Sequence, residues 1–458
     1  MTPPKRQLGL GITAAIVVAN MIGTGVFTGT GFNAQALHDP MTILFAWALG
    51  GLVALCGAAC YAELGTLMPK AGGEYVYLRE AYHPALGFMS GWVSLTAGFS
   101  AAIATSALLF AKYLGTLVDG IGSAAAQKII AIALIATITA MHSFDTKVGG
   151  RVQQIFTIMK VALIVVFIGA GFASGNGNWA HFETQDGGFS NIATTAFGIQ
   201  LMYISFAYSG WNAAAYIAGE VDRPEKTLPR SLLVGTGIVT ALYLLLNVIY
   251  FYALPSDVLG GPRDTFAPIE EVGHAAAVQL FGQSAGSLIT SLIAIALVSA
   301  VSAMVMAGPR VYAAMAADRA LPHQLATHSK RGVPIVAVAA QGVFATVFVI
   351  VGDLGKLMRF AGFTLAIFAA LAVGAVFILR RRGLRGAYRT FGYPVTPIIF
   401  IVVSGWIAYA QIKQNPFESL VVAGLIVMGF LLYVFMVKPR KPVSPEPPKL
   451  PEARVVDE

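Results

Sequence analysis

The chain has 458 residues, of which 57% are hydrophobic and only 11% are charged. A soluble globular protein carries about 25% charged residues, so the composition excludes a soluble enzyme, a secreted disulfide scaffold and a transcription factor. The net charge of +8 resides in the segments between apolar runs and gives no reason to expect a nucleic-acid partner. We therefore expect a protein whose surroundings are the lipid bilayer.

Long apolar runs follow one another along the chain. A helix needs about 20 apolar residues to cross a bilayer, and a backbone in lipid must satisfy its own polar groups, which favours helices. The sequence predicts twelve transmembrane helices, at residues 11–36, 41–66, 86–111, 129–144, 152–173, 190–217, 231–254, 284–308, 334–351, 357–379, 394–411 and 417–437. The last segment, 438–458, contains six prolines and is predicted to be a disordered cytoplasmic tail.

Lysine and arginine are distributed unevenly between the two ends of these spans. With the amino terminus inside, 23 of them fall on the cytoplasmic side and 6 on the outer side. Cytoplasmic loops carry the excess of basic residues in membrane proteins. The distribution predicts a multi-pass protein of the inner (cytoplasmic) membrane with both termini in the cytoplasm.

The first span contains an unusual cluster of glycines. Residues 20–32 read NMIGTGVFTGTGF, with four glycines, and glycine is unfavourable inside a helix. A dinucleotide-binding turn would need a preceding strand and a following acidic residue, which this apolar context excludes. Two interpretations remain: a face of small residues that packs against another helix, through Gly25 and Gly29, or a helix broken to expose its backbone to a ligand.

The sixth span favours the second interpretation. It reads YISFAYSGWNAAAYIAGE at residues 203–220, with Ser209 and Gly210 at its centre and Asn212 close by. Interrupted spans at corresponding positions of two halves are a sequence signature of secondary transporters, and they mark the substrate site. The pattern therefore predicts a transporter.

A broken helix exposes backbone groups of opposite polarity. The second half begins with free N–H groups, here those of Thr24, Gly25 and Val26, which suit a carboxylate. The first half ends with free carbonyls, which suit an ammonium group, and the candidates are those of Met21, Ile22, Phe206 and Ala207. Because an α-amino acid carries both charges on one carbon, it is the predicted substrate class.

Several motifs resemble one known family. IGTGVF at 22–27 and FAYSGWN at 206–212 are similar to the broken-helix motifs of the amino acid–polyamine–organocation superfamily, and of its L-type amino-acid transporter group in particular. Three further segments agree with that group: PKAGGEYVYLREAY at 69–82, GEVDRPEKTLPR at 219–230 and PRVYAAMAADRALP at 309–322.

The resemblance implies an all-α integral membrane fold of the LeuT-like type within one domain, residues 1–437. Two five-helix inverted repeats would occupy about 11–173 and 190–379, with spans one and six broken and two further helices at about 394–437. The substrate contacts that it implies, together with Asn212 from the sixth-span motif, are Met21, Ile22, Gly23, Thr24, Gly25, Phe206, Ala207, Ser209 and Asn212.

The resemblance also raises the question of a partner chain. In animal members a cysteine in the loop after span three forms a disulfide with a single-span partner. The corresponding loop here, 113–127, has no cysteine. The two cysteines of the chain, Cys56 and Cys60, lie inside one apolar run. No disulfide-linked partner is therefore expected.

Lys160 is a strongly charged side chain at mid-depth in the fifth span. Such a charge costs at least about 2.5–3.5 kcal/mol in lipid and is a functional candidate, although a lysine that snorkels to the inner interface is the alternative. In the family a lysine of span five occupies the region that binds sodium in sodium-coupled relatives. By this analogy Lys160 holds spans one and eight together, through Ser299 or Ser302, or takes part in proton coupling.

The combined expectation is a sodium-independent transporter that moves neutral, small to medium L-amino acids by alternating access, through exchange or proton coupling. The segments expected to line the site contain no Asp or Glu, which disfavours the alternative of a cationic amino acid or polyamine antiporter. A multi-pass membrane enzyme is the remote alternative, because the seven histidines form no HxxxH or HExxH motif. No catalytic residue, metal or cofactor is expected.

Overall fold

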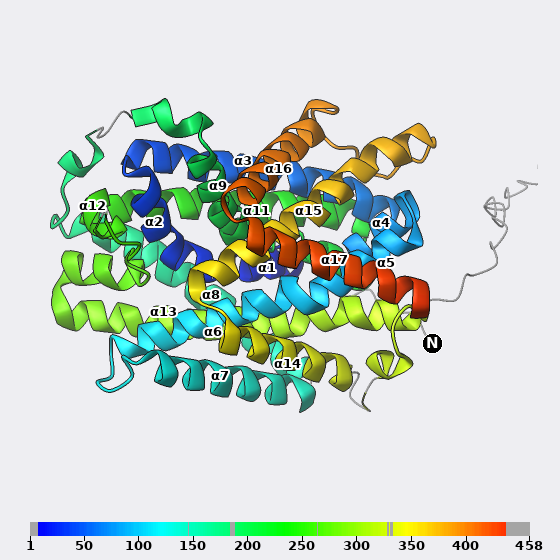
Figure 1. Ribbon diagram of the computed structural model, residues 1–458, viewed down its shortest axis with the longest axis horizontal. Helices are drawn as coiled ribbons and strands as arrows, with labels where there is room; N and C mark the ends of the chain where they lie inside the picture. The colour runs from blue at the N-terminus through cyan, green and yellow to red at the C-terminus, as the bar shows by residue number, and fades with distance from the viewer. Residues whose placement is uncertain are drawn as a thin grey trace, which may run out of the picture.

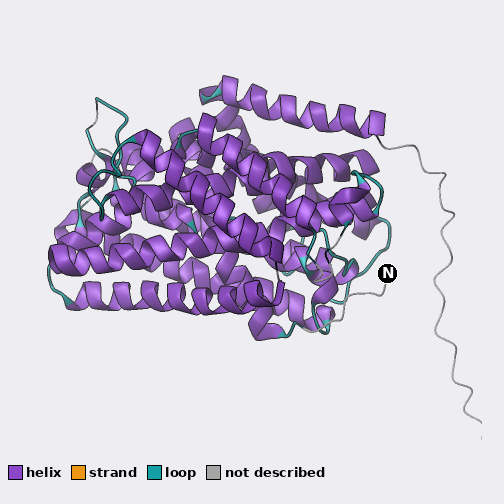
Figure 2. Ribbon diagram, turned by 90° about the horizontal axis from the view of Figure 1, so that it is seen from below, coloured by secondary structure: helices purple, strands orange, loops and turns teal. Residues whose placement is uncertain are grey.

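The computed structural model describes residues 8–144, 146–183, 188–262, 264–327, 329 and 333–436. The predicted tail at 438–458 lies outside the described residues. Within the described ranges the chain forms helices joined by loops, and no strand longer than an isolated bridge occurs there. Figure 2 shows how completely helices dominate this part of the chain. The predicted all-α class is confirmed.

Each predicted apolar run contains one or two helices of the structure. Ten helices or helix pairs of the described chain are long and apolar enough to cross a membrane. The α-helices that fall in the twelve predicted runs are α1 (Leu10–Met21), α2 (Thr24–Leu37), α3 (Pro40–Leu67), α5 (Pro84–Val93), α6 (Phe99–Gly115), α7 (Ala124–Phe144), α8 (Thr146–Ala173), α9 (Thr195–Tyr208), α10 (Ala213–Tyr216), α11 (Pro224–Ala253), α13 (Val272–Ala317), α14 (Ile335–Val351), α15 (Leu354–Arg381), α16 (Val395–Gln414) and α17 (Pro416–Met436).

Short elements connect the long ones. Helix α4 (Glu74–Ala81) lies between α3 and α5, and α12 (Ser256–Gly260) lies between α11 and α13. A π-helical segment, Ser94–Gly98, joins α5 to α6, and short 3-10 turns occupy Trp179–Phe182, Gly188–Ala193, Ala218–Glu220 and His323–Ala326. None of these short elements is long enough to span a membrane.

Local sequence explains where several long helices begin. The Asp39 side chain accepts a hydrogen bond from the backbone N–H of Thr42 at 2.7 Å, and Pro40 occupies the first turn of α3. Asp353 caps α15 in the same way through the N–H of Lys356 at 2.9 Å. An N-cap carboxylate satisfies a helix N–H that has no partner within the helix, and proline fits the first turn because it lacks an N–H.

The long helices run lengthwise through the molecule, which defines two ends (Figure 1). Helices α4 and α5 lie toward the same end as the start of the described chain, here called the α4 end. Helix α12 lies at the opposite end, here called the α12 end. Helix α1 packs against α11, α8 and α13, while α9 packs against α2, α3, α15 and α16. This packing places both interrupted helices inside the bundle.

Candidate functional site

The first span is broken at Ile22 and Gly23. Helix α1 ends at Met21, where the Ile22 backbone turns to an extended conformation (φ −72°, ψ 96°), and α2 restarts at Thr24. Met21 and Ile22 are buried, with 2% and 0% of their surface exposed. The predicted break is therefore present, and it lies inside the protein rather than against lipid.

The sixth span is broken at Ser209 and Gly210. Helix α9 ends at Tyr208, Ser209 has an extended ψ of 150°, and Gly210 has φ of +98°, in the left-handed region that favours glycine. Only a four-residue helix, α10, follows before a 3-10 turn. A side-chain carbon at Gly210 would lie 2.7 Å from the carbonyl of Asn20 on α1. Glycine is needed here both for its backbone angle and for this close approach.

The two breaks adjoin each other. A side-chain carbon at Gly25, in the first turn of α2, would collide with the Cα and Cβ of Ala207 near the end of α9. The Tyr243 hydroxyl of α11 lies between the two broken helices. It donates to the carbonyl of Met21 at 2.5 Å and lies 3.2 Å from the carbonyl of Ala207. Sequence reasoning missed Tyr243, since a tyrosine in an apolar span carries no signal of its neighbours.

Lys160 lies against the first break. Its ammonium donates to the carbonyls of Ala19 at 2.9 Å and Ile22 at 2.8 Å, and its side chain is fully buried. These carbonyls lose their helical N–H partners where α1 ends, so the lysine supplies the donors that the break removes. The alternative of a lysine that snorkels to the inner interface does not fit these contacts.

Lys160 was expected to reach the eighth span through Ser299 or Ser302. The Ser302 hydroxyl on α13 bonds the ring nitrogen Nε2 of His142, on α7, at 2.8 Å. Ser299 is buried on the same helix. Helix α13 still borders the first break, because a side-chain carbon at Gly23 would lie 3.7 Å from the Cβ of Ala300. The Ser302 hydroxyl thus joins α13 to the fourth predicted span.

The remaining predicted contacts lie around the same centre. Phe206 is buried at the end of α9, and its carbonyl accepts the N–H of Ser209 at 3.0 Å. The Thr24 hydroxyl bonds that of Ser106 on α6 at 2.7 Å, which ties α2 to the third span. Asn212 donates to the Glu74 carboxylate at 2.6 Å and to the Tyr216 hydroxyl at 3.0 Å. Glu74, on the connecting helix α4, was not among the predicted residues.

A cavity lies directly beside the second break. Its wall contains Asn20 of α1, Ser209, Gly210 and Asn212 at the break, and apolar side chains of which Phe99 and Met304 are the largest. A second cavity shares Ser209, Gly210 and Asn212 with the first and extends to Glu74 and Trp211. Backbone, small polar and apolar surface thus meet at one place, which is the composition of small-molecule sites.

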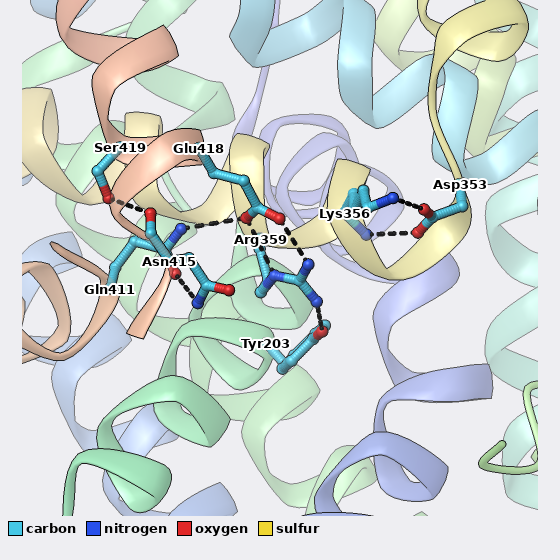
Figure 3. A network of polar contacts seen from close by, with 8 residues as sticks. All are labelled: Tyr203, Asp353, Lys356, Arg359, Gln411, Asn415, Glu418 and Ser419. Carbon is cyan, nitrogen blue, oxygen red and sulfur yellow. Dashed lines mark hydrogen bonds and ion pairs between the residues drawn. The ribbon is translucent and has the colours of Figure 1, made fainter. Parts of the chain in front are cut away.

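Toward the α12 end, side chains of α2, α9, α15 and α17 pack against one another. Phe32 of α2 stacks on Tyr203 of α9 with ring centroids 4.9 Å apart. The guanidinium of Arg359 donates to the Tyr203 hydroxyl at 2.7 Å and pairs with both oxygens of Glu418 on α17, at 2.7 and 3.1 Å. Figure 3 shows Arg359 held between Tyr203 and Glu418, with Gln411 adjoining the carboxylate.

No cluster of three or more His, Cys, Asp or Glu that could hold a metal ion occurs in the described ranges of the chain. The chemistry that the site offers is instead that of backbone dipoles at the breaks, of hydroxyls such as those of Thr24, Ser209 and Tyr243, and of the buried Lys160 ammonium. Two adjoining helix breaks inside a bundle of membrane-length helices define a membrane transporter.

The chain belongs to the amino acid permease family, whose model matches residues 8–447. The serine/threonine exchanger SteT of Bacillus subtilis (strain 168) is 34% identical over 405 residues, which are 87% of this chain and 90% of that protein. The b(0,+)-type amino acid transporter 1 of Homo sapiens is 28% identical over 447 residues, 95% of this chain and 88% of that protein.

The Asc-type amino acid transporter 1 of Mus musculus is 29% identical over 395 residues, covering 82% of this chain and 71% of that protein. These relatives are transporters and exchangers, and the family is one of permeases. The predicted family is confirmed, the protein is a multi-pass membrane transporter, and the enzyme alternative is excluded.

Proposed function

We propose that this permease moves neutral, small to medium L-amino acids across the inner (cytoplasmic) membrane by alternating access, independently of sodium, through exchange or proton coupling. The observation that carries the proposal is the junction of the two breaks, where Tyr243 bridges the carbonyls of Met21 and Ala207. The similarity to an exchanger named for serine and threonine also supports a neutral substrate.

The proposed binding mode uses the backbone at both breaks. The first N–H groups of α2, from Thr24 to Val26, have no partner within the helix and would receive the α-carboxylate. The carbonyls of Met21, Ile22, Phe206 and Ala207 would receive the α-ammonium, which shares them with the donors already present. A carbonyl oxygen has two lone pairs. Tyr243 takes one acceptor position on Met21 and one on Ala207, and Lys160 takes one on Ile22, which leaves a second position on each oxygen for the substrate.

Sodium independence is supported by the position of Lys160. Its ammonium bonds the carbonyls of Ala19 and Ile22 at the break, where a bound metal cation would need oxygen ligands. A fixed positive charge there disfavours a second cation by repulsion. The same lysine remains the candidate for proton coupling, if the transporter uses protons rather than exchange.

The substrate class is supported by the walls of the cavity beside the break. Phe99 and Met304 offer apolar surface, and Ser209 offers a small hydroxyl. Arg359, which lies toward the α12 end, is already paired with Glu418 and Tyr203, which disfavours it as the partner of an acidic substrate. The second candidate, a cationic amino acid or polyamine antiporter, is favoured by Glu74 alone, since this carboxylate borders the adjoining cavity.

The proposed organisation follows the sequence prediction. Both termini would be cytoplasmic, with the α4 end inside, two inverted repeats at about 11–173 and 190–379, two appended helices at about 394–437 and a disordered tail at 438–458. We also propose that no disulfide-linked partner chain is needed. Cys56 and Cys60 are free and buried within α3, which supports this, because neither thiol can reach another chain.

Uptake into proteoliposomes tests the proposal. The purified protein is reconstituted into liposomes that contain serine. Uptake of labelled serine is then measured in sodium buffer and in sodium-free buffer, with each of the twenty amino acids and agmatine as competitors. We expect equal uptake in both buffers and competition by alanine, serine, threonine, valine or leucine. Omitting internal serine separates exchange, which then stops, from proton coupling, which then responds to a pH gradient.

A further inference from the structure

Glu74 is a buried carboxylate that accepts hydrogen bonds from neutral groups. Only 6% of its surface is exposed. Its Oε1 accepts hydrogen bonds from two neutral donors, the hydroxyl of Tyr61 at 2.8 Å and the amide of Asn212 at 2.6 Å. In the described part of the chain, no lysine, arginine or histidine forms an ion pair with it.

Two other carboxylates near the α4 end, Glu63 and Glu220, form ion pairs with arginines. Both oxygens of Glu63 accept from the Arg380 guanidinium, at 2.7 Å from Nε and 2.6 Å from Nη2, and Glu220 pairs with Arg310 at 3.0 Å. Those acids join helices as ion pairs. A buried charge without an opposite charge is costly, and in a membrane protein such a group marks a functional site more often than a structural one.

Glu74 also borders the space that adjoins the second break. One cavity joins Glu74 to Ser209, Gly210 and Asn212, and another joins it to Ser90 and Tyr216. The cavity beside the break shares Asn212 and Tyr216 with these two. Across the linings of the three cavities, Glu74 is the single charged side chain.

We propose that Glu74 is a second, transient site for the ammonium group of the substrate, on the path between the helix breaks and the α4 end. The inference rests on the proposed function and deepens it. An amino acid that leaves the carbonyls at the breaks toward α4 carries its ammonium into a cavity whose one counter-charge is Glu74. The ammonium replaces the Asn212 amide on Oε1, exchanging a neutral donor for a charged one, which makes the stronger hydrogen bond.

This site would act on one side of the membrane only. The Phe32–Tyr203 stack and Arg359 lie on the α12 side of the breaks, and Glu74 lies on the other side, on α4. Loss of its charge should therefore weaken capture of substrate that enters from the α4 end and leave capture from the α12 end unchanged. A purely structural clamp between α4 and α10 would affect both directions alike.

The test is Glu74→Gln, measured in liposomes that hold the protein in one orientation. Half-saturating serine concentrations are determined separately for substrate supplied at each end. Because a hydrogen bond to a charged group contributes about 1.5–3 kcal/mol, we expect half-saturation at the α4 end to rise roughly tenfold or more, with the α12 end unchanged. Glu74→Asp, which keeps the charge but shortens the side chain, should give an intermediate value.

Glu80→Gln is the matched control. Glu80 lies on the same helix, is exposed and pairs with Arg79 at 2.9 Å, so its neutralisation should leave both values at the parent level. The inference is overturned if Glu74→Gln keeps the parent value at the α4 end, or if both ends change equally. If Glu74→Gln does not fold, a parent value at the α4 end for Glu74→Asp overturns it. A parent protein that transports no amino acid would instead refute the proposed function itself.

Discussion

Lys160 and Ile22 lie 138 positions apart in the sequence, and the lysine ammonium donates to the isoleucine carbonyl at 2.8 Å. The bond joins α8 to the point where α1 stops being a helix. Because the Ala19 carbonyl accepts from the same ammonium, one side chain supplies donors for two backbone groups at the break. The break is thus held by a charge from another helix.

Lys160→Ala should leave a protein that reaches the membrane but transports serine at less than about a tenth of the parent rate. The substitution removes both donors, and each buried carbonyl left without a partner costs about 1–3 kcal/mol, so the broken segment loses its fixed geometry. Initial uptake rates, normalised to protein in the liposomes, provide the measurement. The control is Lys356→Ala, since Lys356 is exposed and pairs with Asp353 at 3.0 Å. Parent rates in Lys160→Ala would contradict the role given to this lysine.

Tyr243→Phe should weaken substrate binding by about tenfold while lowering stability by only about 1 kcal/mol, the net value of one hydrogen bond. The hydroxyl sets the distance between the Met21 and Ala207 carbonyls, both proposed to receive the ammonium. Tyr82→Phe is the control, because its hydroxyl donates to the Leu371 carbonyl at 2.9 Å and Tyr82 is in the wall of neither cavity beside the break. Binding is measured by competition against labelled serine. Equal losses in the two variants would show that Tyr243 is merely structural.

Gly25→Leu should abolish binding of serine, because even the first side-chain carbon meets the Ala207 backbone. The measurement is the rise in unfolding temperature that a ligand produces when it binds the folded state. Gly169→Leu is the control, since no atom of the described chain lies within 4 Å of a side-chain carbon placed there. Undiminished stabilisation of Gly25→Leu by serine would place the substrate site elsewhere. Enlarging Ser209 should give the same loss of binding.

Arg359 and Glu418 should show a strong energetic coupling. Their side chains are only 14% and 21% exposed, and the guanidinium contacts both carboxylate oxygens, an arrangement that strengthens an ion pair. A double-mutant cycle with Arg359→Gln and Glu418→Gln should give a coupling of about 1–3 kcal/mol in thermal unfolding. The neighbouring pair Lys356–Asp353 (Figure 3) is 64% and 57% exposed, and surface pairs contribute about 0–1 kcal/mol. A smaller coupling for Arg359–Glu418 than for this surface pair would contradict the prediction.

The breaks themselves could be predicted from the sequence because they follow from local composition. Glycines at 23 and 25 and the Ser209–Gly210 pair weaken a helix wherever it lies, so their positions needed no knowledge of the fold. The isolated charge of Lys160 was equally visible, since a lysine in an apolar run stands out whatever surrounds it.

The partners of these residues could not be predicted in the same way. Tyr243 and Glu74 meet the breaks through packing of distant helices, and neither lies in an unusual local sequence. Ser299 or Ser302 was expected beside Lys160 by analogy, and nothing in the sequence indicated that His142 of α7 bonds the Ser302 hydroxyl. The pairing of polar groups on neighbouring helices depends on how each helix is rotated about its axis and how deep it lies in the membrane. The hydrophobicity of the sequence does not determine either quantity to within one residue.

The central claim is that the joined helix breaks bind a neutral amino acid, and competitive uptake measures this most directly. Proteoliposomes containing the parent protein are given labelled serine together with equal excesses of alanine, leucine, arginine, glutamate or agmatine. The account predicts strong inhibition by the neutral amino acids and little by the other three. Faster uptake of labelled arginine or agmatine than of any neutral amino acid would contradict it.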